Sequence, residues 1–290
     1  MITRVIVLVA AMAAAGCGTQ RVASSAATLC DRPCLKGVLD SYLDAMIKHD
    51  ASKLPTSASL RFTENGSAKK IGEGLWTTAE AITYRLDAID PQGGQVATEA
   101  VVRENGELAH LLVRLKVEGN TISEAETIIC RKGQIDLFGP DKLTAPPPLY
   151  TDLVPAAERV QRDQLKAAAD AYFTAVQTEG TTDYKPAPLA ADANRFENGI
   201  QTTNVAFAGF PAASASEQLD KGFYKNLSIT DRRFPVLDEE HGIALGIMLM
   251  HVRDANTVLI AEMFKISGGR IRQIQAVMVG HPNGAPIGWN

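Results

Sequence analysis

The chain has 290 residues, a hydrophobic fraction of 46%, a charged fraction of 21% and a net charge of −4. At ~150 residues per domain, this length predicts two domains, and the composition excludes disordered, collagen-like and polytopic membrane proteins. The mixed charges, without a long run of either sign, also argue against a nucleic-acid partner.

Residues 1–16 are typical of an export signal, because a positive start is followed by a short apolar run that cannot span a bilayer. The Ala-Ala-Gly-Cys stretch at 14–17 resembles a bacterial lipobox, which implies a lipid on Cys17. An ordinary cleaved signal with a chance cysteine is the alternative. We therefore expect a membrane lipoprotein facing the periplasm, or otherwise a secreted soluble protein, with residues 17–29 as a flexible tether.

The other three cysteines are expected to have structural roles. Cys30 and Cys34 stand at the start of a predicted helix, and export allows them to oxidise if their Cα atoms are close enough. We expect Cys130 to be a small, buried hydrophobic residue. No spacing of cysteine or histidine indicates zinc, and no nucleotide motif occurs, so we expect neither metal nor cofactor.

The chain contains an internal repeat. Arg-Phe-Thr-Glu-Asn-Gly at 61–66 returns as Arg-Phe-Glu-Asn-Gly at 195–199, and each copy follows an amphipathic helix that carries Tyr42 or Tyr172. A Pro-rich stretch separates the copies. The pattern predicts domains at 30–139 and 157–290 joined by a linker at 140–156. Each reads as helix, loop, strand, short helix and four antiparallel strands, with hairpin turns such as Asn105-Gly106.

This order resembles the nuclear transport factor 2-like, or SnoaL-like, superfamily. The resemblance implies an α+β fold of two tandem cones, each a curved antiparallel sheet wrapped around helices with one internal pocket. Thr-Glu-Asn-Gly at 63–66, Gly-x-Gly-Leu-Trp-x-Thr at 72–78 and the Pro-x-Gly-x-x-x-Gly-Trp ending at 289 resemble an uncharacterised exported branch found in fungi and bacteria.

Hairpin registers indicate which side chains enter the cones. If Gly119-Asn120 is a two-residue turn, Glu124 and Glu126 lie on the apolar, concave face. If Gly268-Gly269 is another, Glu262 lies opposite Gln275 at the equivalent place. A carboxyl group buried there has a raised pKa and suits general acid–base chemistry. The alternative is a structural ion pair with an arginine.

The remaining candidates are ring side chains and arginines. Ketosteroid isomerase, in the resembled superfamily, uses a first-helix tyrosine as an oxyanion donor, which Tyr42 matches in position; core packing is the alternative. The predicted catalytic residues are Glu126, Tyr42 and Glu262, and the predicted ligand-binding residues are Trp76, Tyr84, Arg61, Glu124, Tyr172 and Gln275.

Three functions remain open. The first is an exported envelope protein that binds a small apolar or aromatic molecule in a conical pocket. The second is a cofactor-free lyase, isomerase or dehydratase with a buried glutamate as general base, and the third is a structural module whose pockets are filled. Apolar residues on the outer strand face of the second half predict that the two domains pair through their sheets, with a homodimer as a further option.

Overall fold

The computed structural model describes residues 30–222, 227–252 and 256–289, so the expected leader, the tether and Cys17 lie outside the described residues. Within these ranges, no helix is both long and apolar enough to cross a membrane.

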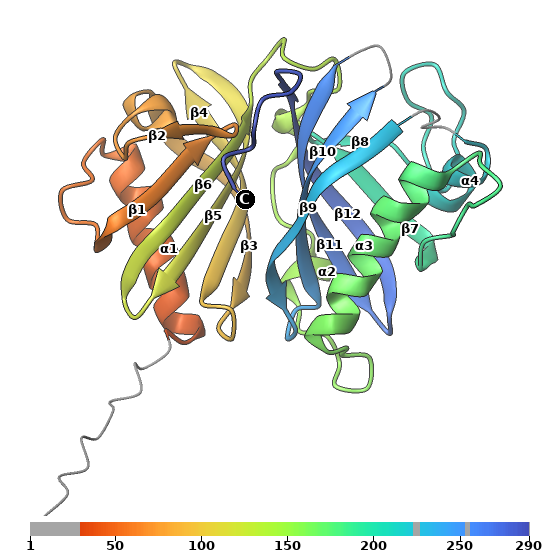
Figure 1. Ribbon diagram of the computed structural model, residues 1–290, viewed down its shortest axis with the longest axis horizontal. Helices are drawn as coiled ribbons and strands as arrows, with labels where there is room; N and C mark the ends of the chain where they lie inside the picture. The colour runs from red at the N-terminus through yellow and green to blue at the C-terminus, as the bar shows by residue number, and fades with distance from the viewer. Residues whose placement is uncertain (1–29, 223–226, 253–255, 290) are drawn as a thin grey trace, which may run out of the picture.

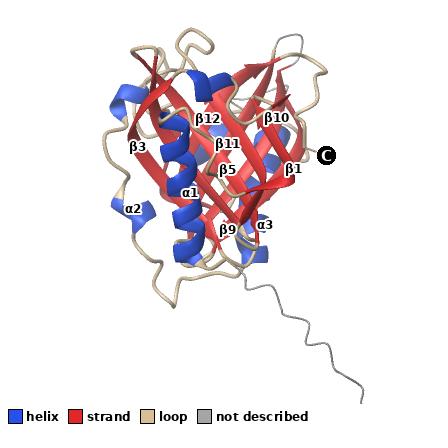
Figure 2. Cartoon of the chain, turned by 90° about the vertical axis from the view of Figure 1, so that its left-hand side faces the viewer, coloured by secondary structure: helices blue, strands red, loops and turns tan. Residues whose placement is uncertain are grey.

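The first unit is a helix laid across a six-stranded sheet. Helix α1 (Arg32–Ile47) begins after the N-cap Asp31 and buries Leu35, Leu39, Tyr42, Leu43 and Met46 against the sheet. Figure 2 shows this helix lying across the strands. The sheet order is β2-β1-β6-β5-β4-β3. Its elements are β1 (Thr56–Glu64), β2 (Ser67–Lys69), the 3-10 helix η1 (Gly74–Thr77), β3 (Ala79–Asp90), β4 (Gln95–Glu104), β5 (Glu107–Glu118) and β6 (Thr121–Cys130).

The second unit repeats this plan with the order β8-β7-β12-β11-β10-β9. Two short elements in the connection, η2 (Pro140–Lys142) and α2 (Pro148–Thr151), lead into the helix α3 (Arg162–Thr178). The rest is β7 (Leu189–Glu197), β8 (Ile200–Gln201), α4 (Ala215–Asp220), β9 (Leu227–Asp238), β10 (Ile243–Val252), β11 (Thr257–Ser267) and β12 (Arg270–His281).

The predicted α+β class with two repeated units is confirmed, with one difference in strand direction. Each sheet is mixed rather than antiparallel, because β1 pairs with β6 and β7 pairs with β12 in parallel. The first strand of each unit therefore returns beside the last strand, which brings the N-terminal motif of the repeat next to the final hairpin.

The two sheets face each other, with α1 and α3 on the outer sides (Figure 1). A core shared by both units fills the space between the sheets. Its members from the first unit include Leu86, Leu112 and Ile128, and those from the second include Leu245, Leu259, Met263 and Val277. Burial of this apolar surface favours the face-to-face arrangement.

A β-bulge in the last hairpin of each unit changes the face of several predicted residues. Val117 lies opposite Ile122 as expected, but from Lys116 onward the partner is shifted by one residue and is Glu124. A bulge inserts one unpaired residue and so reverses which side of the sheet the following side chains occupy. The predicted concave positions of Glu124 and Glu126 are therefore wrong, since both lie on the face between the units.

The same shift occurs in the second unit. Ile266 pairs with Ile271, whereas Lys265 pairs with Gln273, so Glu262 lies opposite Ala276 rather than Gln275. Gln275 therefore moves to the face between the units, while Glu262, before the turn, keeps its predicted concave place. In contrast, the register expected from the Asn105-Gly106 turn holds along the whole of β4 and β5.

Two reciprocal ion pairs join the units. Arg32, at the start of α1, contacts Asp238 at the end of β9 through two nitrogens at 3.0 and 2.7 Å. Arg162, at the start of α3, contacts Asp90 at the end of β3 in the same way, at 2.5 and 2.8 Å. Each aspartate is 1% exposed or less. We call these two pairs the Arg–Asp clamp.

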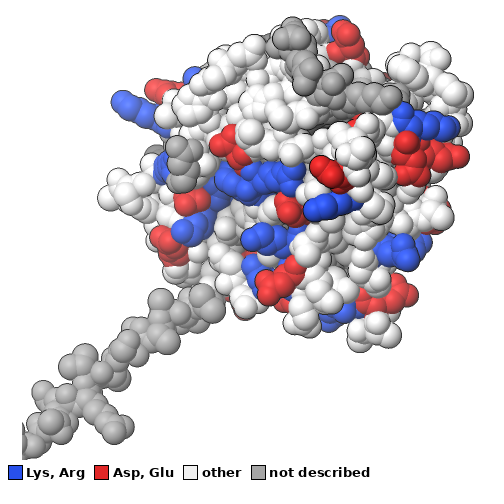
Figure 3. All heavy atoms as spheres, turned by 45° about the vertical axis from the view of Figure 1, so that its right-hand side comes forward, with Lys and Arg blue, Asp and Glu red and all other residues white. Residues whose placement is uncertain are grey.

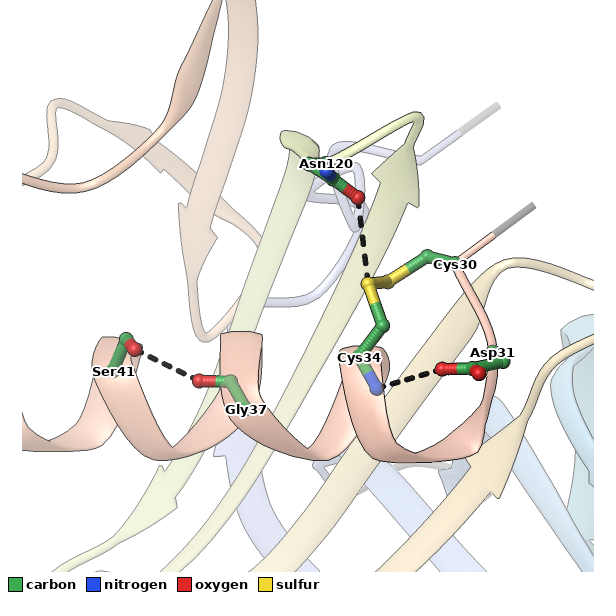
Figure 4. Close-up of a disulfide and its surroundings, with 6 residues drawn as sticks. All are labelled: Cys30, Asp31, Cys34, Gly37, Ser41 and Asn120. Atoms are coloured by element: carbon green, nitrogen blue, oxygen red, sulfur yellow. Dashed lines mark hydrogen bonds between the residues drawn. A yellow bond between two sulfur atoms is a disulfide. The ribbon is translucent and has the colours of Figure 1, made fainter. Parts of the chain in front are cut away.

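The N-terminal end of α1 is fixed by a disulfide. Cys30 and Cys34 are bonded with a Cα separation of 5.2 Å. The Cys34 backbone N–H also donates to the N-cap Asp31 at 3.0 Å, and the Asn120 side chain lies 3.4 Å from the Cys34 sulfur (Figure 4). Cys130 is free and buried.

Asp238→Asn tests the Arg–Asp clamp. Burial raises the pKa of Asp238, but hydrogen bonds from His241, Arg32 and the Ile89 backbone outweigh it and hold that pKa well below its usual range. The charged form therefore stabilises the fold above about pH 4, and this contribution is lost as the pH falls further. We expect the variant to lower the free energy of unfolding by about 2–4 kcal/mol near neutral pH.

Urea denaturation at several pH values measures this effect. The difference between the variant and the natural chain should shrink towards zero below about pH 4. Asp44→Asn, which removes an exposed partner of Lys48, is the control and should change stability by less than about 1 kcal/mol. A pH-independent loss in Asp238→Asn would contradict a role for its charge.

Candidate functional site

Equivalent positions of the two units can be assigned from the Asn-Gly turns. The Asn65 backbone N–H donates to the Thr127 carbonyl at 2.9 Å, and the Asn198 N–H donates to the Ala276 carbonyl at 2.8 Å. Both asparagines have positive φ angles of 49° and 45°, a conformation that asparagine tolerates in turns. Thr127 and Ala276 therefore occupy the same place in the two sheets.

The space between each sheet and its helix, which we call the cone of that unit, differs between the two units at two positions close to this landmark. Val113 lies opposite Thr127 in the first unit, and Glu262 takes its place in the second. Likewise, Phe62 of the first core corresponds to Arg195. The second cone thus holds an acidic residue, Glu262, and a basic residue, Arg195, where the first holds two apolar side chains.

Arg195 organises the polar part of the second cone. Its side chain is fully buried and donates to the Tyr172 hydroxyl at 3.2 Å and to the Gln218 amide oxygen at 2.6 Å. It also forms an ion pair with Glu197 at 3.0 Å. Buried charges are tolerated when they are paired and hydrogen-bonded, and α3, β7 and α4 each supply one of these partners.

Glu262 lies on the same face as Ile260 and Phe264 of the second core, and only 4% of it is exposed. Its Oε2 atom is buried and has no hydrogen-bond partner among the described residues. Burial raises the pKa of Glu262 to about 8; the charge of Glu197 adds to the rise and Arg195 opposes it. Near neutral pH, this side chain is mostly a carboxylic acid that can donate a proton, and the carboxylate that remains is the form that accepts one.

In the first cone, Tyr42 and Trp76 satisfy each other's hydrogen-bonding groups. The Trp76 indole N–H donates to the Tyr42 hydroxyl at 3.3 Å, and the two rings meet edge to face at 5.0 Å. Burial raises the pKa of Tyr42 to about 12. Tyr42 and Trp76 are therefore brought together as predicted, but as packed and hydrogen-bonded partners.

Glu126 lies between the units, and not in the first cone. It accepts from Arg114 Nε at 3.0 Å and from Arg233 Nη2 of the other unit at 2.7 Å, and it is 1% exposed. Glu124 binds the opposite side of Arg114 at 2.7 Å. Glu126 therefore forms the structural ion pair with arginine that was its alternative interpretation from the sequence, and Arg114 and Arg233 are its partners.

Three further predicted residues also lie on the faces between the units. Tyr84 belongs to the shared core, and Gln275 pairs with Met263 of that core. Arg61 is not equivalent to Arg195, because the additional Thr63 in the first motif turns Arg61 away from the cone, and it lies near the C-terminus instead. Of the predicted residues, only Glu262 and Tyr172 share the second cone.

Gln218 and the pairing of Arg195 with Tyr172 were missed from the sequence. The one available signal was the unequal length of the two repeated motifs, which shifts the arginine by one position. Within the described ranges, no group of three histidine, cysteine or acidic residues is placed to hold a metal ion.

Comparison with known proteins identifies a domain but no activity. Residues 158–278 match the family model of DUF8021, a domain of unknown function. No curated protein matches the chain. A solved structure, a de novo designed protein with a curved β-sheet, shares 15% identity with a TM-score of 0.31, over 35% of this chain and 89% of that one. A likeness at this level leaves the function open.

Glu262→Gln tests the environment of the buried acid. Because the folded state raises the pKa of Glu262, its neutral form is favoured, and stability is lost as the pH rises from about 4.5 to about 8. The glutamine variant lacks this loss. We expect it to unfold like the natural chain near pH 5 and to be more stable by several kcal/mol, on the order of 4, near pH 8.5.

Thermal and urea denaturation across this pH range provide the measurement. Glu158→Gln, at an exposed position in the connection, is the control and should follow the natural chain at every pH. If Glu262→Gln also runs parallel to the natural chain from acid to alkaline pH, Glu262 is charged in the fold and the assignment is wrong.

Proposed function

We propose that this chain is an exported, lipid-anchored envelope protein, a tandem member of the nuclear transport factor 2-like superfamily, that binds a small molecule in its second cone. The observation that supports this proposal is the unpartnered Glu262 Oε2, which is buried between the apolar side chains of the second core and the polar group around Arg195. A buried polar atom without a partner destabilises a fold by about 1–3 kcal/mol. A ligand hydroxyl or carbonyl group would remove that cost.

The side chains around Glu262 favour an apolar or aromatic ligand. Phe264 makes edge-to-face contacts with Tyr172 and Phe173, each with ring centroids 5.5 Å apart. The polar groups are few and converge from Arg195 and Glu262, which is the usual composition of a small-molecule site. The ligand would be oriented by these groups and held by the rings.

Proton transfer by Glu262 is the second candidate function. A carboxyl group whose pKa lies near the working pH exchanges protons readily, and Tyr172, held by Arg195, supplies a hydroxyl on the same side. These features suit a lyase or isomerase that needs no cofactor. In the first unit, the mutual hydrogen bond of Tyr42 and Trp76 favours a structural role.

Tyr172→Phe and Tyr42→Phe test which cone binds. Native mass spectrometry of the purified protein should detect a bound small molecule, whose occupancy falls in Tyr172→Phe because Arg195 loses a partner. Tyr42→Phe, the equivalent change in the first unit, should leave occupancy unchanged. Equal loss in both variants, or no bound molecule in the natural chain, would count against the second cone.

Glu262→Gln separates binding from catalysis. Once the bound molecule is identified, a general acid–base role predicts a rate lower by ~100- to 10,000-fold with binding retained. A pure binding protein shows no turnover of that molecule in either form. A lower rate would not result from unfolding, because the glutamine variant is expected to be at least as stable as the natural chain.

Cys17→Ser tests the anchor. A lipid-modified cysteine partitions the protein into membranes, because bacterial lipoprotein processing supplies more than one acyl chain. We expect the serine variant in the soluble fraction after export and the natural chain in the membrane fraction. Equal partitioning of both would remove the lipoprotein assignment and leave the secreted alternative.

A further inference from the structure

A cavity of about 580 Å³ opens between the two units, away from both cones. This size is within the usual range for small-molecule sites. The lining comes from β1, β4, β5, β6, α3, β9 and the C-terminal segment, and its charged and aromatic members include Arg61, Arg114, Lys166, Arg232, Arg233 and Trp289. Figure 3 shows Lys and Arg side chains gathered near the middle of the face that carries α3 and β9.

The cationic groups of this cavity outnumber the carboxylates that neutralise them. Glu126 is shared by Arg114 and Arg233, and Asp170 pairs with Arg232 at 3.1 Å. Together with Glu124, these are three carboxylates against five cations among the described residues around the cavity. Positive charge concentrated in a cleft with low-dielectric walls attracts anions.

Two of the cations are available for a ligand. Arg61 and Lys166 are exposed, and neither forms an ion pair with a carboxylate among the described residues. The cavity therefore presents N–H donors that the protein itself does not use.

Trp289 fixes the arginines that face the cavity. The centre of its ring lies 4.5 Å from the guanidinium carbons of Arg61 and Arg114, and its indole N–H donates to Thr63 at 2.8 Å. Arg61 also donates to the Gly288 carbonyl. Cation–π contacts of this kind hold a guanidinium in one orientation, so the donors are positioned before any ligand arrives.

We propose that this cavity is a binding site for a small dianion that carries carboxylate or phosphate oxygens. Guanidinium groups match both kinds of oxygen with paired, charge-assisted hydrogen bonds. Arg61 and Lys166 are the groups that contact the anion, and Arg114, Arg233 and Trp289 form the rear wall. The site goes beyond the second cone, since it uses neither Glu262 nor Tyr172.

Isothermal titration calorimetry on the mature chain tests this proposal with succinate, glycerol 3-phosphate and vesicles containing phosphatidic acid, each of which carries a dianionic group. We expect saturable binding of at least one of the three and none of glycerol. Binding should weaken as salt is raised, because the charges are partly exposed. Binding of vesicles alone identifies a lipid headgroup as the source of the anion, whereas binding of succinate or glycerol 3-phosphate identifies a free one.

The double variant Arg61→Gln/Lys166→Gln should raise the Kd at least about tenfold, the effect of losing charge-assisted hydrogen bonds. The matched control is Arg103→Gln/Lys48→Gln. It removes the same charge from exposed positions, including an arginine that likewise donates to a glycine carbonyl, and should leave the Kd unchanged. A melting temperature measured without anion verifies that both variants fold.

Two outcomes would overturn the proposal. One is the absence of binding of all three probes at millimolar concentration. The other is equal weakening in both double variants, which would indicate a general effect of net charge. Tyr172→Phe should bind the dianion normally, so failure of this site and failure of the proposed cone site can be told apart.

Discussion

The arrangement of the molecule depends on the Arg–Asp clamp between the units. In each half of the clamp, one aspartate accepts two hydrogen bonds from an arginine and another from a backbone N–H of the opposite unit: Ile89 to Asp238 at 3.0 Å and Leu237 to Asp90 at 3.1 Å. A buried charge that lost these partners would cost several kcal/mol. The clamp therefore sets how the apolar sheet faces meet, and with them the positions of Glu126 and the cavity.

The two units share the same backbone plan but differ in the residues that line their cones. The Asn-Gly turns, the first-helix tyrosines and the hairpin bulges occur in both units. The exchange of Phe62 and Val113 for Arg195 and Glu262 gives the second cone a buried guanidinium and a buried carboxyl group that the first lacks at these positions. Buried polar groups lower stability unless they are satisfied, and of these two carboxyl and guanidinium groups the Glu262 oxygen is the one that remains without a partner among the described residues.

Local sequence signals predicted much of the fold but failed at one irregularity. The Asn105-Gly106 turn determines its hairpin because no bulge follows. In the last hairpin of each unit, a bulge shifts the register, so Glu124, Glu126 and Gln275 were placed on the wrong face while Glu262 was placed correctly. The signal was present: Ile122 with Ala125, and Ile271 with Ile274, are apolar pairs spaced by three, which strict alternation does not allow. Contacts between the units, such as that of Glu126 with Arg233, had no local signal.

The two buried glutamates show why the bulges matter for function. Glu126, turned towards the other unit, is enclosed by two arginines and works as a charged link between the sheets. Glu262, turned into its cone, retains an oxygen without a partner. Had β6 continued without its bulge, Glu126 would have entered the apolar first cone, and the cavity would have lost the carboxylate that holds Arg114 and Arg233 together. The same one-residue insertion therefore keeps the first cone apolar and builds the basic wall between the units.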